Sequence, residues 1–292
     1  TRVDADTIRY DVTIEDPKVF TRPWKMSMPL HRETSARLLE YQCQAEAEEA
    51  RGEFTPLPTW YGQPPPRSGL VSRPYASSIG RPVNTALLAS AAVPRMPDGK
   101  PDLQGTYNST GGSGSWGLEE HAPRFGFPGG PSLIVDPADK KLPYQAWARK
   151  EQQDRLLDER AHEDPTAHCF VAGVPRTMYT GGTPQILQPP GYVVILYDRW
   201  SYRIIPLDGR AHPPETVRLW MGDSVGHWEG DTLVIDTTNL NGKSWLSEIG
   251  DVISHSAHVV ERLTMVDANK IGFEATVDDP LVYTRPWTMA LL

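Results

Sequence analysis

The chain has 292 residues, a net charge of −8, 28 prolines and 24 glycines. The acidic balance argues against a nucleic-acid partner, because phosphate binding needs clustered Lys and Arg, and no apolar run reaches the roughly 18 residues that a membrane span needs. Frequent Pro and Gly between short apolar runs favour a loop-rich, mainly β protein.

The beginning of the chain recurs at its end. Residues 1–29 align with residues 264–292 at a constant offset of 263, and 14 of the 29 aligned positions are identical. The segment TRPW, at residues 21–24, recurs at residues 284–287. Duplication at this spacing indicates a repeated domain and not a solenoid. The chain is therefore either one period of a longer tandem protein or a protein with a duplicated hairpin.

The first 54 residues are expected to hold a hairpin and a helix. Apolar and polar residues alternate over residues 8–14, which predicts a half-exposed strand. Pro17 ends this strand, because proline cannot continue a ladder of hydrogen bonds. Residues 31–54 have the apolar stripe and acidic face of an amphipathic helix. We assign residues 1–54 to the tail of a preceding repeat unit.

The next segment, residues 55–100, is a Pro-rich linker or wrapping arm, because its prolines and glycines prevent regular structure. Residues 101–292 are expected to form a β-barrel-like domain. A charged helix is predicted over residues 142–163, with Trp147 and Leu157 among its apolar contacts.

The other predicted elements of this domain form an antiparallel meander. Strands are predicted over residues 102–107, 185–188, 192–197 and 200–207. Glu229-Gly230-Asp231 indicates a turn before the strand 232–237, and residues 258–277 hold the terminal strands. The predicted fold is mainly β: an antiparallel, barrel-like or strongly curved sheet with two peripheral helices and the Pro-rich arm. Barrels of this kind often hold one small ligand.

Six segments resemble a protein family. They are PDLQGTY at residues 101–107, LPYQAWA at 142–148, PLDGRAHPP at 206–214, WEGDTLVIDTTNLNG at 228–242, HVVER at 258–262 and DDPLVYTRPW at 278–287. Together they resemble a large group of exported bacterial proteins that has no established reaction or ligand. The resemblance implies a β-rich fold and a periplasmic or extracellular location, and it assigns no catalytic residue.

Glu261 is the most informative candidate for chemistry. It shares a strand face with Val259, Leu263 and Met265, which places a carboxylate among apolar neighbours. Burial would raise its pKa unless an Arg or His pairs with it, and such groups are candidates for catalysis. The structural alternative is a salt bridge with an arginine of a neighbouring strand, such as Arg203.

Three histidines lie close to the predicted sheet: His212 in a loop, His227 beside the turn and His258 on a strand. With Glu261 or Asp231 they could form an acid–base pair or a metal site. Their irregular spacing favours hydrogen-bonded structural histidines instead. We assign no metal ligand, and the sequence identifies no cofactor.

The ligand-binding candidates belong to the same predicted strands and turn. They are Arg203, Trp228, Asp231, Asp236 and Tyr202. For Asp236, a partner in a turn or cap is the alternative to a functional role. The two cysteines, Cys43 and Cys169, either pair or stay free, and the sequence does not decide between these states.

Three functions compete. The first, which we rank ahead, is an exported binding or scaffold protein whose barrel pocket holds a small amphipathic or aromatic ligand. The second is a hydrolase or lyase that needs Glu261 and a histidine to converge in a cleft. The third is a structural subunit of a larger envelope or extracellular assembly, in which the Pro-rich arm and the repeated hairpin join neighbours by strand addition, with self-association through the hairpin. A filled interior with an exposed arm would favour the third.

Overall fold

The computed structural model describes residues 1–32, 93–108, 117–123, 129–157, 160, 163–180, 183–197 and 201–291. The chain divides into two compact units, Thr1–Leu39 and Glu40–Leu292. The predicted helix over residues 31–54 and most of the predicted arm over residues 55–100 lie outside the described residues, as does Cys43.

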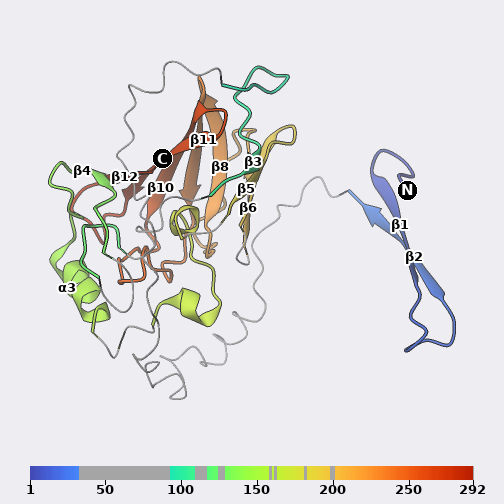
Figure 1. Cartoon of the computed structure of the whole chain (residues 1–292), viewed down its shortest axis with the longest axis horizontal. Coiled ribbons are helices and arrows are strands. Elements are labelled where there is room, and N and C mark those ends of the chain that lie inside the picture. Colours follow the sequence, from blue (N-terminus) through green and yellow to red (C-terminus); the bar gives the residue numbers. More distant parts are fainter. Residues whose placement is uncertain are drawn as a thin grey trace. The chain divides into compact units, whose positions relative to one another are not determined.

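Unit 1 is an antiparallel hairpin of β1 (Thr7–Ile14) and β2 (Trp24–His31) (Figure 1). The alternating pattern of the sequence predicted β1 correctly. Ile8 pairs with Leu30, and Ile14 pairs with Trp24, so the apolar residues of both strands share one face. We call this set the apolar hairpin face: Ile8, Tyr10, Val12, Ile14, Trp24, Met26, Met28 and Leu30.

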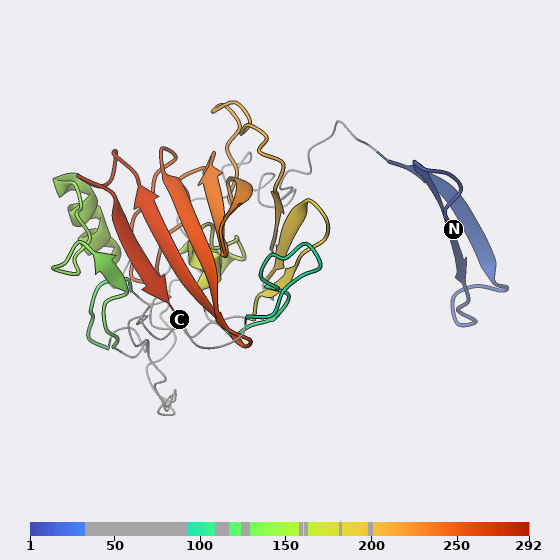
Figure 2. The same cartoon turned by 90° about the horizontal axis from the view of Figure 1, so that it is seen from above.

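Unit 2 is built on a six-stranded antiparallel sheet in the order β4-β12-β11-β10-β9-β8. Its strands are β4 (Ile134–Asp136), β8 (Asp223–Glu229), β9 (Thr232–Thr238), β10 (His258–Asp267), β11 (Lys270–Asp278) and β12 (Trp287–Leu291). Figure 2 shows the long strands of this sheet lying side by side. The meander predicted around the Glu229-Gly230-Asp231 turn is confirmed.

A second sheet has four strands in the order β3-β5-β6-β7. They are β3 (Gly105–Thr106), β5 (Gln185–Leu187), β6 (Tyr192–Leu196) and β7 (Tyr202–Pro206). This sheet packs against the larger one beside β8, where a Cβ atom on Gly226 would lie 2.8 Å from Ile205. The described sheets are antiparallel and none closes into a barrel, so the fold is mainly β with two open sheets.

The described residues contain one α-helix, α3 (Ala146–Arg155), beside β4 (Figures 1 and 2). It begins at Ala146 and not at residue 142, where the predicted helix began, because Tyr144 is bridged to Tyr283 in extended backbone, and Leu156 is its C-cap. The predicted contact Trp147 is 54% exposed, and α3 buries Ala148 and Gln152 instead. Two 3-10 helices follow, η3 (Pro165–His168) and η4 (Arg176–Met178). No helix in these ranges has the length and apolar character to cross a bilayer.

The core of unit 2 lies on the inner face of the six-stranded sheet. Its members on β9 to β12 are Leu233, Ile235, Val259, Leu263, Met265, Phe273, Ala275, Val277, Trp287, Met289 and Leu291. The smaller sheet adds Ile186, Val193, Ile195 and Ile205, and loop residues such as Val174 and Tyr179 also belong to the core. The interior between the sheets is therefore filled by side chains, and the polar exceptions within it carry the most information about function.

Candidate functional site

Glu261 lies fully buried on the inner face of β10, as its alternation with apolar residues predicted. The Arg203 guanidinium, from β7 of the other sheet, donates Nη1 to Oε1 (3.1 Å) and Nη2 to Oε2 (2.6 Å) of Glu261. The salt bridge foreseen as the structural alternative is therefore present. It joins the two sheets rather than two neighbouring strands.

Two further hydrogen bonds hold the Arg203 guanidinium beside Glu261. Nη2 also donates to the hydroxyls of Ser224 (2.9 Å) and Thr237 (3.1 Å). Burial lowers the pKa of Arg203, but the Glu261 carboxylate outweighs burial and holds the pKa above its ordinary value. Buried charges persist only when they are paired in this way. Glu261 is thus the anion of an internal ion pair.

Glu261 and the histidines do not come together. His258 occupies the outer face of β10, three residues before Glu261, and successive strand residues alternate between faces. The predicted acid–base pair of Glu261 with a histidine is not formed. Two of the three histidines, His212 and His258, instead contact the carboxylate of Asp236 on β9.

The Asp236 cluster is a chain of four side chains on the outer face of the sheet. His258 Nε2 lies 2.8 Å from Asp236 Oδ2, and His212 Nε2 lies 3.0 Å from Asp236 Oδ1. His212 Nδ1 lies 2.7 Å from Asp223 Oδ2. His212 therefore links the carboxyl groups of Asp223 and Asp236.

The charges of the cluster support one another. The hydrogen bond from His258 lowers the pKa of Asp236 against partial burial, which would raise it. The hydrogen bond to Asp236 raises the pKa of His258, again against partial burial. The cluster therefore favours an ionised Asp236 beside a protonated His258, an arrangement that binds a loop or moves a proton.

The loop that carries His212 is tied to the end of β9. Asn239, whose φ of 59° lies in the left-handed region, donates its side-chain amide to the carbonyls of Pro214 and Val217, both at 3.0 Å. This anchor returns the loop over the outer face, where His212 meets Asp236. The cluster thus holds a loop on the sheet through His212, whereas His258, the second partner of Asp236, lies on β10.

The remaining predicted site residues lie apart from the cluster. His227 contacts Glu229 (3.2 Å), and Asp231 accepts both guanidinium nitrogens of Arg95 (2.7 and 2.6 Å). The Trp228 ring lies 5.8 Å from Lys100 Nζ, and Tyr202 is exposed on the face of β7 opposite Arg203. These ligand-binding candidates share no common site in the structure.

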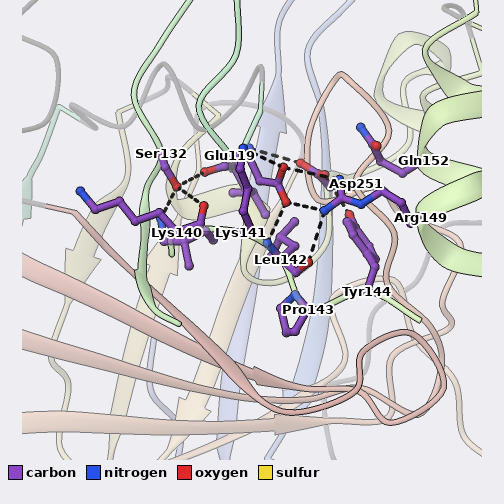
Figure 3. A network of polar contacts seen from close by, with 12 residues as sticks. Glu119, Ser132, Lys140, Lys141, Leu142, Pro143, Tyr144, Arg149, Gln152 and Asp251 are labelled. Carbon is purple, nitrogen blue, oxygen red and sulfur yellow. Dashed lines mark hydrogen bonds and ion pairs between the residues drawn. The ribbon is translucent and has the colours of Figure 1, made fainter. Parts of the chain in front are cut away.

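A polar network that the sequence analysis missed ties three loops together near α3 (Figure 3). Asp251, which is buried, accepts the hydroxyls of Tyr144 (2.8 Å) and Ser247 (2.6 Å) and the backbone N–H of Leu118 (3.2 Å). Burial raises the pKa of Asp251 against these hydrogen bonds. The only sequence signal was the position of Tyr144 inside the segment LPYQAWA.

Glu119 continues the same network towards the surface. Its carboxylate accepts the Leu142 N–H (2.7 Å) and Arg149 Nη2 (2.6 Å), and the Arg149 guanidinium lies 4.5 Å from the centre of the Tyr144 ring (Figure 3). These polar groups have protein partners, which is the expected state of a structural network. The network ties the loops that carry Glu119, Tyr144 and Asp251 to one another.

Within the described ranges, no three His, Cys, Asp or Glu side chains are arranged to hold a metal ion. Cys169 is exposed. Comparison of the chain with protein-family models, curated proteins and solved structures found no match.

Proposed function

We propose that this protein is a structural subunit of a larger assembly and that its N-terminal hairpin joins it to neighbouring protein. The observation that carries this proposal is the exposure of the apolar hairpin face. Tyr10 is 44% exposed and Trp24 38%, whereas Phe273 and Trp287, their counterparts at an offset of 263, are 6% and 0% exposed. The same sequence element is buried in unit 2 and uncovered in unit 1.

The exposed apolar hairpin face is expected to bind another protein surface. A two-stranded hairpin alone is marginally stable in water, and contiguous exposed apolar surface marks an interaction site. Unit 2 also exposes apolar side chains among the described residues, and Leu187, Tyr192 and Tyr202 share the outer face of the smaller sheet. The hairpin differs because its apolar side chains are the counterparts of buried ones in unit 2, so we expect a partner to cover them.

The competing functions have less support. Glu261 is held by Arg203 and meets no histidine, so the predicted hydrolase or lyase lacks its acid–base pair. The space between the sheets is filled by core side chains, so a binding protein with an internal pocket for a small ligand has no supporting observation here. Export to the periplasm or the extracellular space is proposed from the family resemblance.

Sedimentation analysis of the full chain over micromolar concentrations tests the proposal. We expect self-association that Met26→Lys with Met28→Lys abolishes, because charges then interrupt the apolar hairpin face. The matched control is Thr13→Lys with Ser27→Lys, which adds the same charges to the opposite face and should leave association unchanged. Monomeric wild-type protein at all concentrations, or equal effects of both variants, would refute the proposal.

A further inference from the structure

We propose that the partner of the N-terminal hairpin is a sheet of the unit 2 type whose terminal-hairpin position is vacant. The terminal-hairpin position is the place between β10 and β4 that β11 and β12 fill in unit 2. This inference rests on the proposed function and names the partner of the same apolar face.

The two hairpins have the same strand register. Tyr10 pairs with Met28 and Ile14 with Trp24. Adding 263 to these numbers gives Phe273 with Leu291 and Val277 with Trp287, which are the observed pairs of β11 and β12. A one-residue slip would turn every side chain to the other face. The hairpin is therefore already in the register that the terminal-hairpin position requires.

The turns between the strands also match. The N–H groups of Val19 and Phe20 donate to the carbonyl of Asp16 at 3.1 and 2.8 Å. Their counterparts Val282 and Tyr283 donate to Asp279 at 3.0 and 2.8 Å.

The aromatic contact after the turn is preserved as well. The rings of Phe20 and Trp24 meet edge to face at 5.8 Å and 74°, and those of Tyr283 and Trp287 at 5.5 Å and 71°. The hairpin thus carries the buried conformation before any partner covers it, which lowers the entropic cost of docking.

Unit 2 shows what the partner must supply. The Asp279 carboxylate accepts the N–H and hydroxyl of Ser254 (2.6 and 2.7 Å), and Arg285 makes a bidentate ion pair with Asp136 (3.1 and 2.7 Å). The hairpin keeps the acid and the arginine as Asp16 and Arg22.

The N-terminal hairpin cannot form one hydrogen bond that the C-terminal hairpin makes in unit 2. The Tyr283 hydroxyl donates to the carbonyl of Val252 (2.7 Å), and Phe20 at the equivalent place has no hydroxyl. We therefore expect the partner to supply an apolar sheet face and a free strand edge like that of β10. It should also supply an N–H and a hydroxyl in the place of Ser254, to bind Asp16, and a carboxylate in the place of Asp136, to bind Arg22.

A count of hairpins and positions excludes an intact second copy as this partner. Each chain has two such hairpins, whereas the described residues form one terminal-hairpin position, which β11 and β12 fill. In a pure sample the hairpins can cover only one another. A sheet of this type with its last two strands missing or displaced provides the matching surface.

Disulfide trapping between two full chains tests the inference, with Cys43 and Cys169 replaced by Ser in both. The donor carries Asp11→Cys. The acceptor carries Arg262→Cys, and its position is opened by Trp287→Ala or, more strongly, by Trp287→Asp. Arg262 pairs directly with Glu274, the counterpart of Asp11, and directly opposed Cβ atoms lie about 4.5–5.5 Å apart.

We expect donor–acceptor dimers on non-reducing gels with both opened acceptors and at least fivefold fewer with an acceptor that keeps Trp287. A donor with Arg9→Cys, displaced by two residues along the strand, should give few dimers. Absence of dimers from both opened acceptors, including an unfolded Trp287→Asp acceptor that the donor does not rescue, overturns the inference. Equal yields from the Asp11→Cys and Arg9→Cys donors overturn it too.

The two proposals fail separately. Self-association that depends on Met26 and Met28, without trapping at Arg262, refutes only the named partner. Trapping at Arg262 in a protein whose wild-type chain never associates refutes only the proposed assembly function.

Discussion

Replacement of Glu261 by Gln tests whether this carboxylate stabilises the fold or is available for chemistry. Glu261 and Arg203 are both buried, and the guanidinium has no other carboxylate within the described hydrogen bonds. Glu261→Gln leaves the Arg203 charge buried without its counter-ion. Breaking a buried pair in this way typically costs about 3–5 kcal/mol, a large part of the roughly 5–15 kcal/mol that stabilises a domain.

The assay is urea unfolding followed by far-ultraviolet circular dichroism, with the midpoint and slope fitted separately. The control is Glu274→Gln on the exposed face of β11, which should change the free energy of unfolding by less than about 0.5 kcal/mol. Replacing Arg203 and Glu261 together by Leu should recover much of the loss, since an apolar pair needs no counter-ion. A loss below about 1 kcal/mol for Glu261→Gln would refute the argument.

Three further predictions follow from the same geometry. Trp287→Ala should cost about 3–5 kcal/mol of unfolding free energy, whereas Trp24→Ala should cost less than about 1 kcal/mol because Trp24 is exposed; equal losses would contradict the difference in burial. Tyr144→Phe should cost about 1–3 kcal/mol, because it leaves an oxygen of the buried Asp251 and the Val252 N–H unpaired; unchanged calorimetric stability would count against the network. The raised pKa of His258 makes its contribution to stability complete below pH 6.5, its ordinary value, and lost as the pH rises through the folded value. The stability difference between wild type and His258→Gln, measured by urea titration at several pH values, should shrink across that window, and a constant difference would contradict it.

The sequence predicted β1, β3, β5 to β7 and β9 to β11, because alternation of apolar and polar residues reports directly on the face that each residue occupies. It named no strand for β4 or β12. It placed Glu261 inward and foresaw the meander around Glu229-Gly230-Asp231. It began the helix of residues 142–163 too early, because the local pattern does not show that Tyr144 pairs with Tyr283 in extended backbone. It also predicted a barrel-like sheet, since alternation within strands says nothing about closure.

The sequence analysis named three of the four side chains of the Asp236 cluster but not Asp223, and it did not predict their contacts. Asp236, His212 and His258 were all named, but the sequence grouped the histidines with Glu261 or Asp231. Asp236 became the meeting point only because the loop held by Asn239 returns over the outer face of the sheet. The buried Asp251 gave no periodic signal, because it lies in an irregular loop.

The sequence alone determined the duplication of the hairpin, because the repeat is visible as identity at an offset of 263. It also determined the face of each predicted strand residue, because alternation depends on neighbours a few positions away. Only the tertiary structure decided that Arg203 crosses between sheets to reach Glu261 and that one hairpin is buried while its counterpart is exposed. Contacts and burial of this kind depend on how segments far apart in the chain pack, and local patterns do not encode that packing.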